Sequence, residues 1–540
     1  MRCLESFVHL CAIGMFDNHE VDILTLDTDQ SNGNKGRVEE LIDIYNKVKS
    51  NDETNTDGGT INRDTFFSAK LNLYKFYTNY GDQSRKSFKV LSHTSNNETK
   101  GENKDVSDLF YDEATVQEFE LDHGYRAQTH LGSMLMYHGI IEAARNAKLK
   151  GDNAEVQDRN LKKFLEKLQE AQGDARVFVF GSVFGGTGAS SIPVIPVALR
   201  DATKILMDGH NLDLSNVKFG ATLLTNYFSF NSPNAQYKAS QKVVADSNNF
   251  ALNSQAAMQF YQEDPTVRST YKRFYHIGWP MPKFDVGSKG DTVTGGQEQK
   301  NACHVVELMC ACAAYDFFTI EDAELDRKEV AYFYRSIGDE GGVLTFQGND
   351  FLTNGVLFEN KLGAFFTFAH MVLSQSEAAW SDDSIPTIGT HGFIAKFATQ
   401  NIHDYDGISL NQCKEINDYL RLFGYKFDKE NNMIKGWIYQ IYESVKPGRF
   451  LFNETAFKDL RQEMKGISCG QLFIDPNHNW GMKKGLLGGK SDNSVDDLIK
   501  TMTDPKSFPR VADQLVNTTK EKFLAHIYNA ITINQKFELN

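Results

Sequence analysis

Apolar positions in residues 1–300 alternate between short runs typical of buried strands and longer stretches with a helical period. The first helix is predicted at 2–15, where apolar side chains recur three or four positions apart. Strands are predicted at 21–26, 176–180, 218–225 and 273–279. Helices are predicted at 37–49, 131–148, 158–172, 193–207 and 237–261, with one that is apolar nearly all round at 301–318. This order predicts an α/β fold with a mainly parallel sheet and helices on both faces.

Beyond residue 320 the pattern changes. A strand is predicted at 342–346 and helices near 360–375, 412–423 and 513–531, with Trp380 and Trp437 packed in cores. Polar or glycine-rich stretches at 50–64, 94–107 and 284–299 predict loops. We therefore predict a first domain at 1–300, a long buried central helix at 301–320, and a mostly helical or α+β C-terminal domain at 321–540.

Charge and cysteine content narrow the functional classes. The formal net charge of −14 and the absence of a long Lys/Arg run argue against nucleic acid as a partner. Seven cysteines, an odd number without a CxxC pair, argue against a disulfide framework or zinc site and favour a reducing, cytoplasmic setting. The histidines form no HExxH motif, and GxSxG is absent, so neither a catalytic metal site nor an α/β-hydrolase is supported.

Two stretches suggest targeting or membrane segments at first sight. The apolar N-terminus is interrupted by Glu5 and His9, and no small-residue cleavage site follows it. Residues 177–199 carry no charge and are long enough to span a bilayer, but they include four glycines and two prolines. We interpret this second stretch as a strand, a turn and the start of a buried helix.

The turn in that stretch is the most informative feature of the sequence. A β-branched and aromatic strand runs into Gly185, Gly186, Thr187 and Gly188, and a helix follows. Glycines let backbone N–H groups approach phosphate oxygens, and the helix N-terminus adds a partial positive charge. The turn matches neither the Walker A loop nor GxGxxG. The alternative is a tight strand-to-helix turn that binds no ligand.

This segment resembles the phosphate-binding GGGTGSG turn of the tubulin and FtsZ superfamily, particularly its bacterial tubulin-like members. The inner GGTG is retained, while Phe184, Ala189 and Ser190 depart from the family pattern. The helix after the turn carries Pro193-Val194-Ile195 where the family has Pro-Val-Val. The resemblance covers residues 1–325 approximately.

Four further segments resemble family loops and fall in the same order. They are residues 26–30 with Asp27 and Asp29, Gly124-Tyr125-Arg126 leading to Gly132, residues 225–230 with Phe228, and Asn301 at the head of the central helix. In the family these loops lie near the phosphates, the sugar and the guanine base. Asp27 and Asp29 would orient the nucleotide or a Mg²⁺-bound water, because ligands bind at the carboxyl ends of parallel strands. Alternatively, each aspartate simply caps the next turn.

The resemblance implies a GTP-binding protein that assembles head to tail into filaments, with Mg²⁺ and with GTP hydrolysed between subunits. Glu321 and Asp322 follow the central helix, where the family places the acidic loop that completes the neighbour's hydrolytic site. A solvated acidic loop is the alternative for these two residues. Partners would be other copies of the chain, with membrane or defence-related proteins as further possibilities by analogy.

Three departures keep other functions open. Met1 falls at the start of the first helix, and the family's first strand and glycine loop do not precede it; either the true start is upstream or they are lost. Asn231 and Ala235 replace the family's ribose-contacting Glu and Arg, and residues after 330 do not match its second domain. A non-catalytic scaffold is therefore one alternative. A dinucleotide oxidoreductase using Asp27 or Asp29 is another, but no GxGxxG precedes these residues.

Overall fold

The computed structural model describes most of the chain up to residue 380 and part of the remainder. The described residues are 1–16, 19–29, 31–49, 65–77, 109, 111, 124–125, 127–207, 216–230, 245–279, 284–285, 295–326, 330–335, 339–340, 343–380, 414–430, 432–452, 482–484, 490–492, 524 and 528.

Two parallel sheets form the centre of the fold. The first pairs β1 (Glu20–Asp27) with β2 (Lys70–Tyr77). The second has the order β3 (Arg176–Val179), β4 (Lys218–Leu224), β6 (Tyr271–Ile277), β8 (Ala331–Arg335), and all its neighbours are parallel. The predicted α/β class with parallel strands is therefore confirmed, although the strands form two sheets instead of one.

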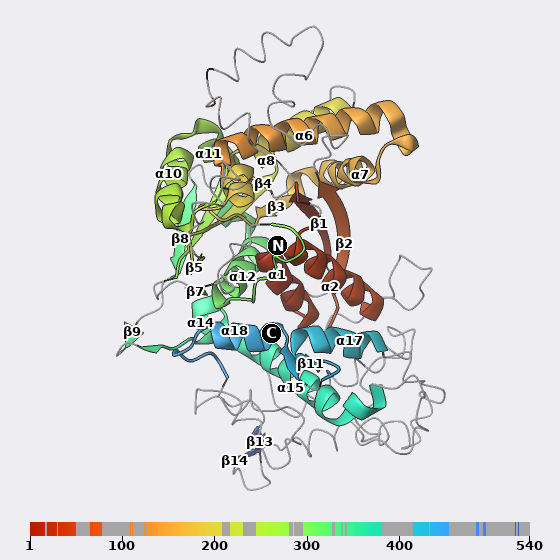
Figure 1. The fold of residues 1–540 in the computed structure, drawn as a ribbon, viewed down its shortest axis with the longest axis vertical. Coiled ribbons are helices and arrows are strands. Elements are labelled where there is room, and N and C mark those ends of the chain that lie inside the picture. Colours follow the sequence, from red (N-terminus) through yellow and green to blue (C-terminus); the bar gives the residue numbers. More distant parts are fainter. Residues whose placement is uncertain are drawn as a thin grey trace.

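Helices cover both faces of these sheets (Figure 1). One layer holds α6 (Thr129–Lys150), α7 (Val156–Ala171) and α8 (Gly186–Leu206). The other holds α1 (Arg2–Ala12), α2 (Gly33–Lys49) and α12 (Val305–Thr319). Strand β4 shows the alternation that this requires: Phe219, Ala221 and Leu223 join the core under the first layer, while Gly220 faces α12. A Cβ on Gly220 would lie 2.7 Å from the Phe317 ring, so α12 packs directly on the strand backbone.

Helix α12 is buried along most of its length, and C-terminal helices pack beyond it. These are α15 (Gly355–Trp380), α17 (Lys414–Phe423) and α18 (Trp437–Ser444), which share one hydrophobic core with α1, α2 and α12 (Figure 1).

The shorter helices are α10 (Phe250–Glu263), α11 (Pro265–Thr270), α13 (Asp322–Leu325), α14 (Gly348–Phe351) and the 3-10 turns Gly151–Asn153, Gln172–Asp174 and Ser247–Asn249. The short strands are β5 (Phe228–Ser229), β7 (Phe284–Asp285), β9 (Asp339–Glu340), β10 (Val343–Leu344), β11 (Tyr425–Phe427), β12 (Met433–Lys435), β13 (Met482–Lys484) and β14 (Lys490–Asp492).

Helix α8 contains two internal prolines whose missing N–H groups are compensated by tyrosines. In a regular helix, residues 193 and 196 would donate to the carbonyls of Ala189 and Ile192, and proline cannot. The hydroxyl of Tyr261 donates instead to the Ala189 oxygen at 2.7 Å, and that of Tyr271 to the Ile192 oxygen at 2.7 Å. Both carbonyls are therefore satisfied, and the helix continues through the prolines.

Several predicted boundaries are wrong. The helix predicted from residue 193 begins at Gly186, and the one predicted from 237 begins at Phe250, with residues 237–244 outside the described part. The central helix begins at Val305, so Asn301 lies in the segment before it. Strand β2 and helix α18 were not predicted, and β7 lies within the predicted loop 284–299.

Other predictions can be placed as follows. The stretch 177–199 is strand, turn and helix, as interpreted above, and Trp437 is buried. No helix in the described part of the chain is long and apolar enough to cross a membrane. The predicted loops at 50–64 and 94–107, the helix at 513–531 and the side chain of Trp380 lie outside the described residues.

Candidate functional site

A groove of about 1040 Å³ separates the two sheets and is lined by every residue of β1 and β3. Among the described residues, β1 pairs only with β2 and β3 only with β4, so each strand turns an unpaired edge toward the groove. Both strands start near the carboxyl end of α12. The rings of Phe16 and Phe318 lie 6.4 Å apart, and Arg176 donates to the Phe318 carbonyl oxygen at 2.9 Å.

Both strands also end near the beginning of α12. After β1, Asn34 bonds to Asn301, four residues before the helix. After β3, the ring of Phe184 lies 6.5 Å from that of Tyr227, whose hydroxyl donates to Glu307 in the first turn. The strands therefore run in the same direction along the groove. Their carboxyl ends, where ligands bind in parallel α/β proteins, meet at one end of it.

The glycine turn forms one wall of this carboxyl end. Helix α8 begins at Gly186 directly after Gly185, and no side chain caps it. The N–H groups of Gly186, Thr187 and Gly188 therefore have no acceptor within the described part of the chain. Together with the helix dipole, these donors make the turn suited to an anion.

Packing alone also requires two of these glycines. A Cβ on Gly186 would lie 2.8 Å from the Cβ of Tyr125, and a Cβ on Gly188 would lie 2.5 Å from the amide nitrogen of Ser182. At Gly185 a Cβ would meet only the Ser182 hydroxyl, at 3.0 Å. Glycine at 186 and 188 is thus explained without a ligand, and the unpaired amides are the feature that points to one.

Asp27 and Asp29 both line the groove but have different environments. Asp29 is buried, and its carboxylate accepts bonds from Ser31, from the Asn32 side chain and from the Gly296 amide at 2.7 Å. Asp27 accepts bonds from the amides of Thr28 and Asp29 at Oδ1 alone. Burial, reinforced by the charge of Asp29, raises the pKa of Asp27 to about 6.

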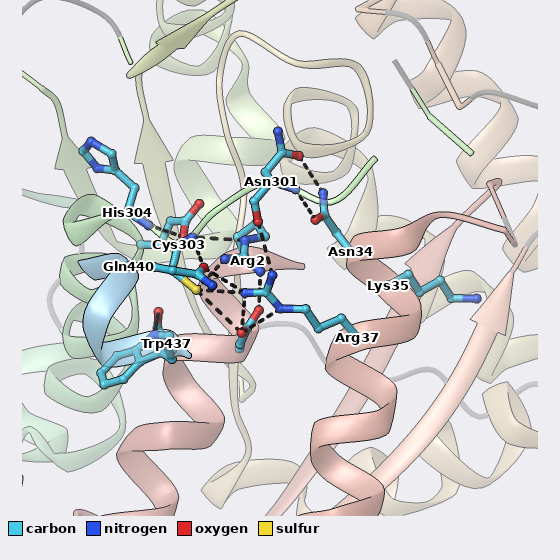
Figure 2. Close-up of polar contacts among 12 residues, drawn as sticks. Arg2, Asn34, Lys35, Arg37, Asn301, Cys303, His304, Trp437 and Gln440 are labelled. Carbon is cyan, nitrogen blue, oxygen red and sulfur yellow. Dashed lines mark hydrogen bonds and ion pairs between the residues drawn. The ribbon is translucent and has the colours of Figure 1, made fainter. Parts of the chain in front are cut away.

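Asn301 faces the same end of the groove and is held by helix α2. Its backbone N–H donates to Asn34 Oδ1 at 2.9 Å, and its Oδ1 accepts from Asn34 Nδ2 at 2.7 Å (Figure 2). Arg37 donates to its carbonyl oxygen at 3.4 Å. Figure 2 shows the amide nitrogen of Asn301 directed away from Asn34, and it donates to no other described residue. A donor with a fixed direction is therefore available to a ligand.

Aromatic rings form the wall next to the glycine turn. Phe228 lies 5.4 Å from Phe184 and 5.9 Å from Phe250 between ring centroids, and all three rings line the groove. Phe184 is buried in this aromatic cluster, 4.8 Å from Phe250. These rings offer an apolar surface suited to a sugar or base.

A buried ionic network lies beneath Asn301 and joins α1, α2 and α12 (Figure 2). Glu5 contacts both Arg2 and Arg37, and Arg2 lies 3.8 Å from Glu307. Burial opposes ionisation of Glu5, but the two guanidinium groups outweigh it and hold its pKa below the usual range. Burial raises the pKa of Glu307, which has only one arginine close to it. Two arginines and two acids thus balance one another in a network of which Arg2, Glu5 and Glu307 are buried and Arg37 is partly exposed.

Glu321 and Asp322 lie at the opposite end of α12. Asp322 is exposed, receives hydrogen bonds from Lys218 at 2.6 Å and Arg176 at 2.8 Å, and lines the far end of the groove. These two bonds, from Lys218 and then Arg176, lower the pKa of Asp322. The 15 residues of α12 separate it from Asn301 by about 22 Å. Asp322 therefore cannot contact a ligand of ordinary size held at Asn301 in its own chain.

The structure brings most of the predicted ligand residues together at the carboxyl end of the groove. They are Gly185, Gly186, Thr187, Gly188, Asp27, Asp29, Phe228 and Asn301. Arg126, Asn231 and Ala235 lie outside the described residues. Arg37 and Gln440, which contact the Asn301–Cys303 segment, were missed because no local motif marks them.

Comparison with known proteins identifies no relative. No family model, curated protein or solved structure matches the chain.

Proposed function

We propose that the chain binds a nucleoside triphosphate, GTP, at the carboxyl end of the groove and assembles head to tail. The observation that carries the proposal is that the uncapped start of α8 faces the same groove as Asn301 and Asp27. Anion donors, a directed amide and a carboxylate together suit the phosphate, base and cation of a magnesium nucleotide. The order of the five segments in the sequence supports the same function.

Each residue has a definite part in this proposal. The amides of Gly186, Thr187 and Gly188 hold the phosphate chain, and Asn301 donates to the base. Phe228 covers the sugar, and the second oxygen of Asp27 would be available to hold Mg²⁺. The metal offsets phosphate charge when bound. Because Asp322 lies at the other end of α12, hydrolysis requires a second copy that presents Glu321 or Asp322 to this nucleotide.

Two observations favour a second candidate, a scaffold without hydrolysis. Asp322 is already paired with Arg176 and Lys218, and packing explains two of the glycines. Such a chain would bind partners, or nucleotide alone, without turnover. Phosphate release in the presence of GTP separates the two candidates.

The test compares Thr187→Glu with Thr187→Gln. A carboxylate in the first turn of α8 is favourable for the helix, so the Glu variant should keep its thermal stability. The same carboxylate repels phosphate, and we expect GTP affinity to fall at least tenfold by calorimetry, with Gln much less affected. Wild-type protein should also pellet with GTP and not with GDP. Equal GTP affinity in the two variants, or no heat with wild-type protein, would refute the proposal.

A further inference from the structure

Helix α18, far along the chain, supplies hydrogen-bond acceptors to the head of α12. Gln440 Oε1 accepts from the Cys303 amide at 2.8 Å, and Ser444 Oγ accepts from the Val305 amide at 2.9 Å. These amides flank His304, the residue that caps α12. The first N–H groups of a helix have no partner within it, so α18 satisfies donors that the α12 region cannot satisfy alone.

The same glutamine reaches Asn301 by a second route. Gln440 Oε1 also accepts from Arg37 Nη2 at 3.3 Å, and the other terminal nitrogen of Arg37 donates to the Asn301 carbonyl oxygen at 3.4 Å (Figure 2). Arg37 is fixed in turn by Glu5, at 2.8 Å. The Asn301–Cys303 segment is therefore held between α2 on one side and α18 on the other.

The position of Asn301 depends on this support as well as on Asn34. Asn34 binds its Oδ1 and its backbone N–H, which sets the plane of the side chain but not the path of the following residues. That path is fixed two residues later, where Cys303 meets Gln440. A shift of about 1 Å in a positioning group is enough to weaken a directed interaction markedly.

We propose that Gln440 is a positioning residue for base recognition, so that docking of α18 and binding of the base are thermodynamically coupled. The inference rests on the proposed nucleotide function and adds a regulatory input to it. Gln440 Nε2 donates to the Lys435 carbonyl oxygen at 2.7 Å, which ties the side chain to the end of β12, directly before α18. Any interaction that displaces β12 and α18 lowers affinity for the nucleotide. By reciprocity, nucleotide binding tightens α18 on the body of the protein.

The coupling predicts a difference between nucleotide and inorganic triphosphate. In Gln440→Met the unbranched shape is kept and the acceptor is lost. We expect GTP affinity to fall about five- to tenfold, the equivalent of one net hydrogen bond. Inorganic triphosphate, which reaches only the glycine turn, should bind as it does to wild-type protein. Gln440→Glu, which keeps an acceptor oxygen, should restore most of the GTP affinity.

The matched control is Glu443→Gln on the same helix. Glu443 is exposed and pairs with the Lys435 side chain, whereas Gln440 uses the Lys435 carbonyl oxygen, so both ligands should bind normally. Hydrogen exchange gives the reciprocal readout: GTP should slow exchange of the α18 amides, and triphosphate should not. Unchanged GTP affinity in Gln440→Met, or an equal loss for both ligands, would overturn this inference while leaving the proposed function standing. Wild-type protein that binds neither ligand would overturn both.

Discussion

At the scale of single residues, the two aspartates after β1 show how similar sequence positions acquire different roles. Asp29 is saturated by its own turn and by Gly296, which agrees with the turn-capping interpretation. Asp27 receives both of its hydrogen bonds at one oxygen, and the other accepts none from the described residues. Both aspartates were predictable as groove residues from their place at a strand end. Their different roles were not predictable, because they depend on the distant Gly296.

Asp27 also makes a prediction about pH. Its pKa is raised to about 6 in the folded chain, so its contribution to stability is fully present below about pH 4 and is lost as pH rises through 6. Asp27→Asn removes this titration. Relative to wild type, we expect the variant to gain free energy of unfolding between pH 4 and 7, by up to about 3 kcal/mol at about 1.4 kcal/mol per pKa unit. Urea unfolding at several pH values measures this difference in the free energy of unfolding. If that free energy changed with pH in the same way for both proteins, the raised pKa of Asp27 would be contradicted.

At the scale of elements, α8 shows what a local pattern cannot reveal. Proline is favoured in the first turn of a helix, so Pro193 predicted a helix start. The real start is seven residues earlier because Tyr261 and Tyr271, from elements well separated in sequence, satisfy the carbonyls that the prolines leave open. Glycines at the true start concealed it further, since they carry no helical pattern.

The pairing of Tyr271 with Pro196 can be tested by a double-mutant cycle. Tyr271→Phe leaves the buried Ile192 oxygen without a donor and should cost about 1–3 kcal/mol of stability. Pro196→Ala restores an N–H at the position that donates to this oxygen, so the cost of Tyr271→Phe should shrink by about 1 kcal/mol in that background. Denaturant unfolding measures all four proteins. Tyr261→Phe, which faces the Ala189 oxygen, is the control and should show no coupling to Pro196→Ala.

Two other elements escaped prediction for physical reasons. In β2, polar side chains bond across to β1: Asn72 to Glu20 and Asp22, and Tyr74 to Asp22. These bonds stabilise a strand whose apolar pattern is incomplete. Helix α18 is only eight residues long and is rich in aromatic and β-branched residues, which individually favour strands. Its helical state comes from burial against α1 and α12, a long-range effect.

At the scale of the whole molecule, the parallel α/β order was predictable because alternating strands and helices permit few arrangements. The grouping of the glycine turn, Asp27 and Asn301 followed from it, since parallel strands present their carboxyl ends on one side. The separation into two sheets and the contact of α18 with the head of α12 were not predictable. Both depend on contacts between residues far apart in sequence, such as Cys303 and Gln440.

The length of α12 makes a prediction about assembly. If nucleotide binds at one end and Asp322 acts at the other, Thr187→Glu and Asp322→Asn should each lose GTP hydrolysis. When the two variants are mixed, part of the hydrolysis should return. A contact between them can place the intact nucleotide site of the Asp322→Asn chain against the intact Asp322 of the Thr187→Glu chain. Phosphate release from the mixture measures the recovery. Asp326→Asn, which also removes a partner of Lys218, is the control and should stay active alone.

The groove between β1 and β3 has a mechanical consequence. No backbone ladder crosses it in the described part of the chain, so the β1–β2 pair is held to the larger sheet through side-chain packing by α1, α2 and α7. Side-chain packing without backbone hydrogen bonds separates more readily than a paired sheet, and local opening occurs first in such regions. With increasing denaturant, we expect the β1–β2 pair to separate from the larger sheet before the rest of the molecule unfolds. Because the glycine turn and Asp27 line the groove from its two sides, the proposed nucleotide would hold the two sheets together.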